Sequence, residues 1–168
     1  ECVKVLLEKG ANIDIQNESG YIALILASDN GHIECVKVLL EKGANIDIQN
    51  ESGYIALILA SDNGHIECVK VLLEKGANID IQNENDDTAL ILASHNGHAE
   101  CVKVLLKKGA NINIQNNRGN TARDVAKTSK IKRLLRPKQL KFEDLKKYEE
   151  GNCPICLDEL ESRTTFTK

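Results

Sequence analysis

The chain contains 168 residues, of which 22 are lysine or arginine and 25 are aspartate or glutamate, so its formal net charge at pH 7 is −3. That near balance excludes a uniformly basic nucleic-acid binder and a polyacidic tail, and a hydrophobic content of 42 % is enough for a buried core. The sequence has no apolar run long enough to span a bilayer and no apolar secretory signal, so we expect neither a membrane span nor secretion.

An internal repeat of 33 residues organises the chain. Residues 1–33 and 34–66 are identical, and residues 67–99 differ from them only at Asn85, Asp86, Asp87, Thr88, His95 and Ala99. A fourth copy begins at Glu100 and diverges after Gln115. Because the sequence contains no methionine and starts inside a repeat, we expect a fragment of a longer product with a half repeat at its N-terminus.

Each copy predicts a helix, a loop and a second helix. In the segment 34–42, apolar side chains alternate with charged ones at the spacing of a helix with one buried face, and Gly43 suits a left-handed cap. Asparagine, aspartate and glycine make 44–54 a turn region. The apolar segment 55–60 could be a strand by composition, but its two alanines and the following Asn-Gly favour a short buried helix. A unit of this size cannot bury its own faces, so the copies must stack.

These copies resemble ankyrin repeats. The resemblance rests on Gly-His at 31–32, 64–65 and 97–98, on Val-Lys-Val-Leu-Leu-Glu-Lys-Gly-Ala-Asn, and on Ala-Leu-x-Leu-Ala at 23–27, 56–60 and 89–93. It covers residues 1–135 and implies an all-α solenoid of stacked helix-turn-helix units with β-turn fingers. The family's Thr-Pro-Leu-His is replaced by Ile-Ala-Leu-Ile at 22–25 and 55–58 and by Thr-Ala-Leu-Ile at 88–91, so we expect weaker caps on these helices.

The two ends of the stack are predicted to differ. Residues 100–135 are a more polar copy, as a terminal repeat that meets water requires, and residues 136–152 form a linker with a short amphipathic pattern. At the other end the helix over residues 1–9 lacks its partner. We therefore expect its apolar face, Cys2, Val3 and Leu6, to be exposed or frayed.

Four cysteines occupy one position in every copy: Cys2, Cys35, Cys68 and Cys101. Stacked helices lie about 8–10 Å apart, which is too far for a disulfide between neighbouring copies, so we expect buried free thiols. Free thiols without a secretory signal predict a reducing, intracellular and cytoplasmic location.

The remaining pair, Cys153 and Cys156, lies in Cys-Pro-Ile-Cys-Leu-Asp-Glu-Leu, outside the repeats. This spacing lets two thiolates reach one zinc ion, but only half of a four-ligand site is present. The segment 153–168 resembles the start of a RING finger. That resemblance makes Cys153 and Cys156 zinc ligands and Ile155 a contact for a ubiquitin-conjugating enzyme, with six further ligands absent from the sequence. Another zinc module, a redox pair and a chance pair remain alternatives.

Charge is distributed unevenly along the chain. Residues 1–99 carry a net charge of −10 and residues 100–168 a net charge of +7. The basic stretch lacks the aromatic side chains that stack on bases, so nucleic acid is not the expected partner. The ankyrin resemblance places the partner on the concave face, at Glu18, Ser19, Tyr21, Asp29 and Asn30, at Glu51, Ser52, Tyr54, Asp62 and Asn63, and at Glu84, Asn85, Asp87 and His95 with Asn96.

These side chains form an acidic stripe with two tyrosines, which predicts a protein partner with a basic surface. No catalytic set stands out in the repeats. The two resemblances together imply partner or substrate recognition for a RING-type ubiquitin ligase, and this fragment itself would have no ligase activity. The alternative is a non-enzymatic ankyrin scaffold or adaptor, and a redox enzyme that uses Cys153 and Cys156 is a third possibility. Solvated loop tips without a partner would also explain the stripe.

Overall fold

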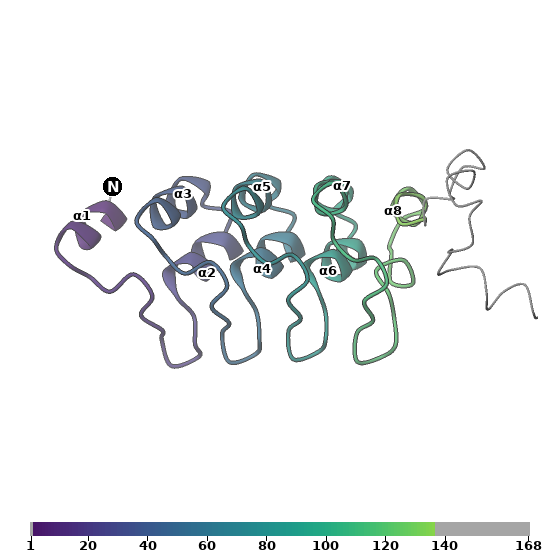
Figure 1. Cartoon of the computed structure of the whole chain (residues 1–168), viewed down its shortest axis with the longest axis horizontal. Helices are drawn as coiled ribbons and strands as arrows, with labels where there is room; N and C mark the ends of the chain where they lie inside the picture. The colour runs from purple at the N-terminus through teal and green to yellow at the C-terminus, as the bar shows by residue number, and fades with distance from the viewer. Residues whose placement is uncertain (1, 137–168) are drawn as a thin grey trace, which may run out of the picture. The chain divides into compact units, whose positions relative to one another are not determined.

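The computed structural model describes residues 2–136. Its helices are α1 (Cys2–Glu8), α2 (Ala23–Asp29), α3 (Ile33–Glu41), α4 (Ala56–Asp62), α5 (Ile66–Glu74), α6 (Ala89–Asn96), α7 (Ala99–Lys107) and α8 (Ser129–Leu134) (Figure 1). Within this range no strand forms, and one isolated β-bridge joins Gln115 and Thr121. The helix prediction for 55–60 is therefore confirmed over the strand alternative.

The helices stack in two rows (Figure 1). We call α2, α4 and α6 the inner helices, since each packs on the next, and α1, α3, α5, α7 and α8 the outer helices, which pack on one another in the same order. Each inner helix also packs on the outer helix that follows it. Four finger loops, residues 10–22, 43–55, 76–88 and 109–121, project together on the side of the inner helices (Figure 1). The predicted stack of helix pairs with turn fingers is confirmed for these residues.

The inner and outer helices differ in how much of their surface is buried in the core. Every residue of α4 from Ala56 to Ser61 is buried, because α2 and α6 cover it on both sides. An inner helix can therefore be apolar all round, whereas an outer helix needs only one apolar face. On the outer row that face is supplied by Val36, Val69 and Val102, all fully buried, while lysine and glutamate point to solvent.

The expected weak caps are present on two inner helices, α2 and α4, but not on the third, α6. Ile22 and Ile55 stand at the N-caps of α2 and α4 and make no side-chain cap. At the same position before α6, the Thr88 hydroxyl oxygen accepts a hydrogen bond from the Ile91 amide at 3.3 Å. The left-handed conformation predicted for Gly43 is also present, with φ +87°.

The first helix forms although no inner helix precedes it, and it packs on α3. Leu6 is 60 % exposed, whereas Leu39, one repeat later, is 2 % exposed because α2 covers α3. Exposure of Leu6 was expected and is confirmed. Val3 is half-buried, because α1 packs on α3, so the expectation of an exposed side chain was wrong there. The side chain of Cys2 lies outside the described part of the structure.

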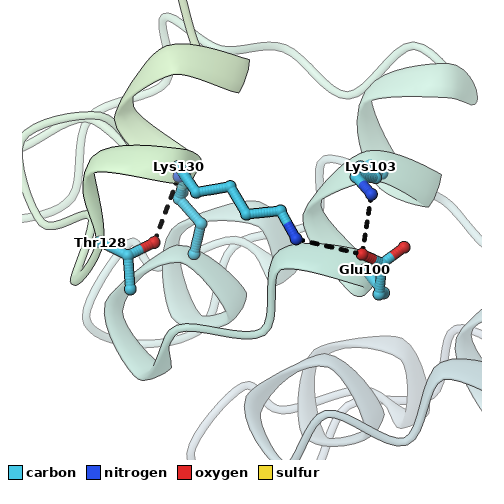
Figure 2. Close-up of polar contacts among 5 residues, drawn as sticks. Glu100, Lys103, Thr128 and Lys130 are labelled. Carbon is cyan, nitrogen blue, oxygen red and sulfur yellow. Dashed lines mark hydrogen bonds and ion pairs between the residues drawn. The ribbon is translucent and has the colours of Figure 1, made fainter.

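The fourth repeat has an outer helix but a turn where its inner helix would be. The Asp124 carboxylate accepts hydrogen bonds from the Thr121 amide at 2.9 Å and from the Thr121 hydroxyl at 2.6 Å, which fixes this turn. Helix α8 follows and packs on α7. Figure 2 shows Lys130 of α8 reaching Glu100 of α7 at 3.6 Å, beside the Lys103–Glu100 pair at 2.8 Å. The buried side chain of Ile131 and the exposed Lys130–Glu100 ion pair both join the last helix to the stack.

The repeat cysteines behave as small apolar residues. Cys68 and Cys101 are 1 % exposed, Cys35 is half-buried, and all three are free thiols, as predicted. Burial raises the pKa of the Cys101 thiol to about 11, so this group stays protonated and unreactive at neutral pH. None of the helices in residues 2–136 is long and apolar enough to cross a membrane. The predicted linker helix and the segment 153–168, with Cys153, Ile155 and Cys156, lie outside the described residues.

Candidate partner-binding surface

Each finger ends in a turn closed by an asparagine. In the second finger the Asn50 side-chain oxygen accepts hydrogen bonds from the amides of Ser52 at 3.0 Å and Tyr54 at 2.9 Å. The main chain adds two bonds, from the Gly53 amide to the Asn50 carbonyl at 2.9 Å and from the Asn50 amide to the Tyr54 carbonyl at 3.0 Å. Asn17, Asn83 and Asn116 make the same turn in the other fingers. The finger tips therefore have one repeated, fixed geometry.

Hydrogen bonds also join each finger to the next. The Gln49 side-chain amide donates to the carbonyl of Gly53 at 2.9 Å in its own finger and to that of Gln82 at 3.1 Å in the following one. The Glu84 amide donates to the Ser52 carbonyl at 3.2 Å. These contacts recur at the other boundaries between repeats. The fingers form one hydrogen-bonded row, so side chains at equivalent positions are held in register.

Glycine at the tip allows this close approach. A Cβ on Gly53 would lie 2.9 Å from both the Asn83 Cα and the Glu84 nitrogen, and its φ is +76°. The third finger differs, because Asp86 takes this position with φ +58°. Aspartate is one of the few residues with a side chain that adopts this left-handed conformation at modest cost.

The predicted site residues at the ends of the inner helices link the repeats. Asp62 accepts a hydrogen bond from the Asn96 side chain at 2.7 Å through Oδ1, and its carbonyl accepts from His98 Nε2 at 2.8 Å. Asp29 accepts in the same way from Asn63 at 2.9 Å and from His65 at 2.9 Å. These polar groups are largely occupied within the stack.

Half-burial has an electrostatic consequence at this boundary. Burial raises the pKa of the Asp62 carboxyl, while His98 and the Asn96 hydrogen bond oppose the rise. Burial also raises the pKa of the Tyr54 hydroxyl, and the carboxylates of Asp62 and Asp87 add to that rise. Tyr54 thus lies in a negative environment at the base of the finger row.

Exposure separates the predicted residues into two groups. The finger-tip residues and the inner-helix C-caps are exposed, as is the histidine of the third repeat: Glu18, Ser19, Asn30, Glu51, Ser52, Asn63, Glu84, Asn85 and His95. Half-buried positions are Tyr21, Asp29, Tyr54, Asp62, Asp87 and Asn96. Within residues 2–136, no hydrogen bond or ion pair holds the carboxylates of Glu18, Glu51 and Glu84, which leaves them free for a partner.

On the side of the fingers and inner helices of the first three repeats, negative charge is not balanced by lysine or arginine. Residues 10–33, 43–65 and 76–98 hold ten aspartates and glutamates and no lysine or arginine. We call this surface the acidic face. On the outer helices the charges pair instead, as in Lys37–Glu34 at 2.9 Å and Lys70–Glu67 at 2.7 Å. The acidic face ends at the fourth repeat, where Asn117 stands in the column of Glu84.

Part of this surface is not evident from the sequence. Asp47 Oδ1 accepts a hydrogen bond from the Asn78 amide of the next repeat at 3.0 Å, and Asp14 and Asp80 make the same contact with Asn45 and Asn111. These aspartates add charge to the acidic face and also join the repeats. Their recurrence every 33 residues is the only sequence signal that could have identified them.

A cavity of about 200 Å³ lies between the third and fourth fingers. Three predicted site residues, Asn85, Asp87 and His95, line it together, and residues of the fourth finger form the opposite wall. Among residues 2–136 no group of three histidine, cysteine or acidic side chains is placed to hold a metal ion. The arrangement provides surfaces for recognition, and we find no set of side chains arranged for catalysis in this part of the chain.

Stacked helix pairs with an aligned row of turn fingers define a helical repeat protein of the solenoid class. Residues 1–83 match the family model described as ankyrin repeats in three copies, and residues 72–126 match a second one described as ankyrin repeats in many copies. The chain belongs to the ankyrin-repeat family, whose repeats are protein–protein interaction modules. A comparison with curated proteins found no match.

Proposed function

We propose that the acidic face binds a protein partner through a basic surface. The observation that carries this proposal is the charge of residues 10–33, 43–65 and 76–98. Together they hold ten acidic residues and no lysine or arginine. Since packed helices lie about 8–10 Å apart, equivalent carboxylates recur at about that spacing. A partner with lysine or arginine side chains at a similar spacing would contact several repeats at once.

The row of free glutamates is the part of the acidic face best placed for such contacts. Glu18, Glu51 and Glu84 are exposed at the finger tips, whose backbone is fixed by the hydrogen bonds between fingers. Little ordering is therefore needed on this side when a partner binds. Exposed charges act mainly on the association rate and are screened by salt, with a Debye length of about 8 Å at physiological ionic strength.

The test compares two triple variants with the same change in charge. Glu18→Lys, Glu51→Lys and Glu84→Lys reverse the finger row, and Glu8→Lys, Glu41→Lys and Glu74→Lys reverse exposed glutamates of the outer helices. A partner is first identified by affinity capture on the unaltered protein and then purified. We expect the finger variant to weaken its binding by about tenfold or more and the outer variant to change it by less than about threefold.

Salt provides a second readout for the same partner. Binding to the unaltered protein should weaken as ionic strength rises, and the finger variant should lose most of this dependence. Equal losses for the two triple variants would reject the acidic face as the binding surface. A partner whose affinity does not respond to salt or to the finger variant would reject the basic-surface proposal.

The Cys-Pro-Ile-Cys sequence favours a second proposal, which concerns a longer protein. There Cys153 and Cys156 are the first two zinc ligands of a RING finger, Ile155 contacts a ubiquitin-conjugating enzyme, and the ankyrin stack selects the substrate. Bound zinc would supply the structural centre that folds such a finger. The ligase would then act by bringing the charged conjugating enzyme near a substrate lysine, which is a proximity effect.

Extension of the reading frame past Lys168 distinguishes this proposal from a scaffold. Further cysteine and histidine ligands, bound zinc in the extended protein, and ubiquitin transfer that Cys156→Ser abolishes would support the ligase. Cys101→Ser is the matched control, because this thiol is buried in the repeats. No further ligands would favour the scaffold, and insulin reduction that depends on Cys156 would favour redox chemistry instead. In each case free repeat thiols support a location inside the cell.

A further inference from the structure

The repeats differ from one another where the cavity lies. The first two repeats are identical, and of the six positions that change in the third, Asn85, Asp87 and His95 line the cavity. The fourth repeat supplies Arg118 and Asn120 to the opposite wall, where its sequence departs from the others. Internal divergence therefore coincides with a hollow of about 200 Å³ on the binding side of the stack.

Loss of a tyrosine accounts for the hollow. Tyr21 and Tyr54 are half-buried and pack against the core in the first two repeats. The equivalent positions in the third and fourth repeats are Asp87 and Asn120, and both line the cavity. Each of these side chains is far smaller than a tyrosine ring. The space that aromatic side chains fill elsewhere in the stack is thus left open between the third and fourth fingers.

Hydrogen bonds fix the walls of this cavity. The Asn116 side-chain amide donates to Asp87 Oδ1 at 2.9 Å across the two fingers. The Asn117 amide donates to the Asn85 carbonyl at 3.0 Å, and the Asn120 amide donates to the Asn116 side-chain oxygen at 3.0 Å. A cavity with walls of this kind is already formed before a ligand enters, which lowers the entropic cost of binding.

The lining determines which ligand the cavity takes. Ile91, Leu92 and Val125 provide an apolar part, while Asp87 and Arg118 contribute one negative and one positive charge. Opposite charges on the walls favour a neutral ligand over an ion of either sign. An apolar body with one polar tip, able both to donate and to accept a hydrogen bond, fits this combination.

We propose that the cavity between the third and fourth fingers binds a tyrosine side chain of the protein partner. Its ring would replace the one that Tyr54 supplies one repeat earlier, and its hydroxyl would donate to Asp87 and accept from Arg118. This proposal rests on the proposed function, in which the finger side of the stack binds a protein. It adds a position on that side where an aromatic side chain of the partner is inserted.

The test uses N-acetyl-tyrosinamide as the probe and the complete chain labelled with nitrogen-15. Saturable shifts are expected for the amides of Asn85, Asn117 and Asn120, with a Kd of about 1 mM, the range that ligand efficiency allows for a probe of this size. N-acetyl-argininamide and N-acetyl-glutamate amide serve as charged comparison probes. Each should shift these amides at least about threefold less at the same concentration.

Two variants close the cavity from opposite walls. Asp87→Tyr and Asn120→Tyr each restore the residue found in the first two repeats, and each should abolish the tyrosinamide shifts while the remaining amide spectrum is preserved. Two independent variants are used so that misfolding of one does not decide the result. Absence of saturable shifts in the unaltered protein, equal or stronger shifts with a charged probe, or full binding in both tyrosine variants would overturn the proposal.

The outcome is separable from that of the proposed function. The charge-reversal variant at Glu18, Glu51 and Glu84 should leave the tyrosinamide shifts unchanged, because none of these residues lines the cavity. Conversely, a partner could still require the acidic face but bind equally well to Asp87→Tyr and Asn120→Tyr. That result would reject the proposed tyrosine contact and leave the proposal for the acidic face in place.

Discussion

Replacement of Gly64 by alanine tests how the repeats are joined. Gly64 has φ +75°, and a Cβ on it would lie 2.5 Å from Nδ1 of His98 in the next repeat. That imidazole also donates a hydrogen bond from Nε2 to the Asp62 carbonyl at 2.8 Å. A methyl group at position 64 must therefore displace the His98 ring and break this link. Gly76 provides a matched control, since its φ is +90° but, apart from its chain neighbours, no heavy atom of residues 2–136 lies within 4 Å of a Cβ there.

The two substitutions should lower the free energy of unfolding by different amounts. An alanine held in the left-handed region costs about 1–2 kcal/mol, and this cost applies to both sites. Loss of the His98–Asp62 hydrogen bond adds about 0.5–1.5 kcal/mol at position 64 alone. We expect Gly76→Ala to lower the free energy of unfolding by about 1–2 kcal/mol and Gly64→Ala by about 1.5–3.5 kcal/mol.

Urea unfolding followed by circular dichroism measures these differences, with the slope against urea concentration checked for constancy. A third variant, His98→Ala, completes a double-mutant cycle. In that background the cost of Gly64→Ala should fall to that of Gly76→Ala, because there is no ring left to displace. Equal costs for both glycine substitutions, or an unchanged cost of Gly64→Ala without His98, would refute the reasoning.

Three further predictions follow from burial and capping. Leu72→Ala should destabilise the protein by about 2–5 kcal/mol in urea unfolding, whereas Leu6→Ala, at the equivalent exposed position, should change stability by less than about 0.5 kcal/mol. Thr88→Val should cost about 1 kcal/mol in the same assay, because the Ile91 amide loses its capping oxygen. Burial raises the pKa of Cys101 to about 11, so the folded state should lose stability as pH rises from about 9 towards 11, and a pH series on Cys101→Ala should be flatter.

The 33-residue period was enough to predict the architecture, because stacking follows directly from units that cannot bury their own faces. The predicted outer helix over 34–42 matches α3 (Ile33–Glu41) within one residue. The weak capping at Ile55 was also predictable, since an aliphatic side chain has no acceptor for the exposed amides of the first turn. The stacking, the helix bounds and the missing cap thus follow from the repeat and from the residue types within one copy.

Contacts between repeats were harder to predict. Residues at the ends of helices and in loops read as exposed, yet Asp62 is half-buried because Asn96 and His98 of the following repeat fold over it. The fourth repeat was expected to be a polar copy of the others, and its composition did not predict the turn at Asp124 in place of an inner helix. The partners of Asp62 come from the following repeat and are set by the three-dimensional stack, whereas the turn at Asp124 is held by its local hydrogen bonds to Thr121.

Identical repeats create a problem of register that the third and fourth fingers can resolve. A basic partner that contacts the first two repeats would have nearly the same energy if it moved along by one repeat, because the two copies present the same side chains. Charge complementarity alone therefore gives affinity without a unique position. The cavity bounded by Asp87 and Arg118 lies between the third and fourth fingers, and at the preceding boundary Tyr54 stands at the position of Asp87. Insertion of one side chain in the cavity would make a single register of the partner more stable than the neighbouring registers. The sequence differences between repeats at the cavity therefore carry more information about specificity than the acidic residues that recur in every copy.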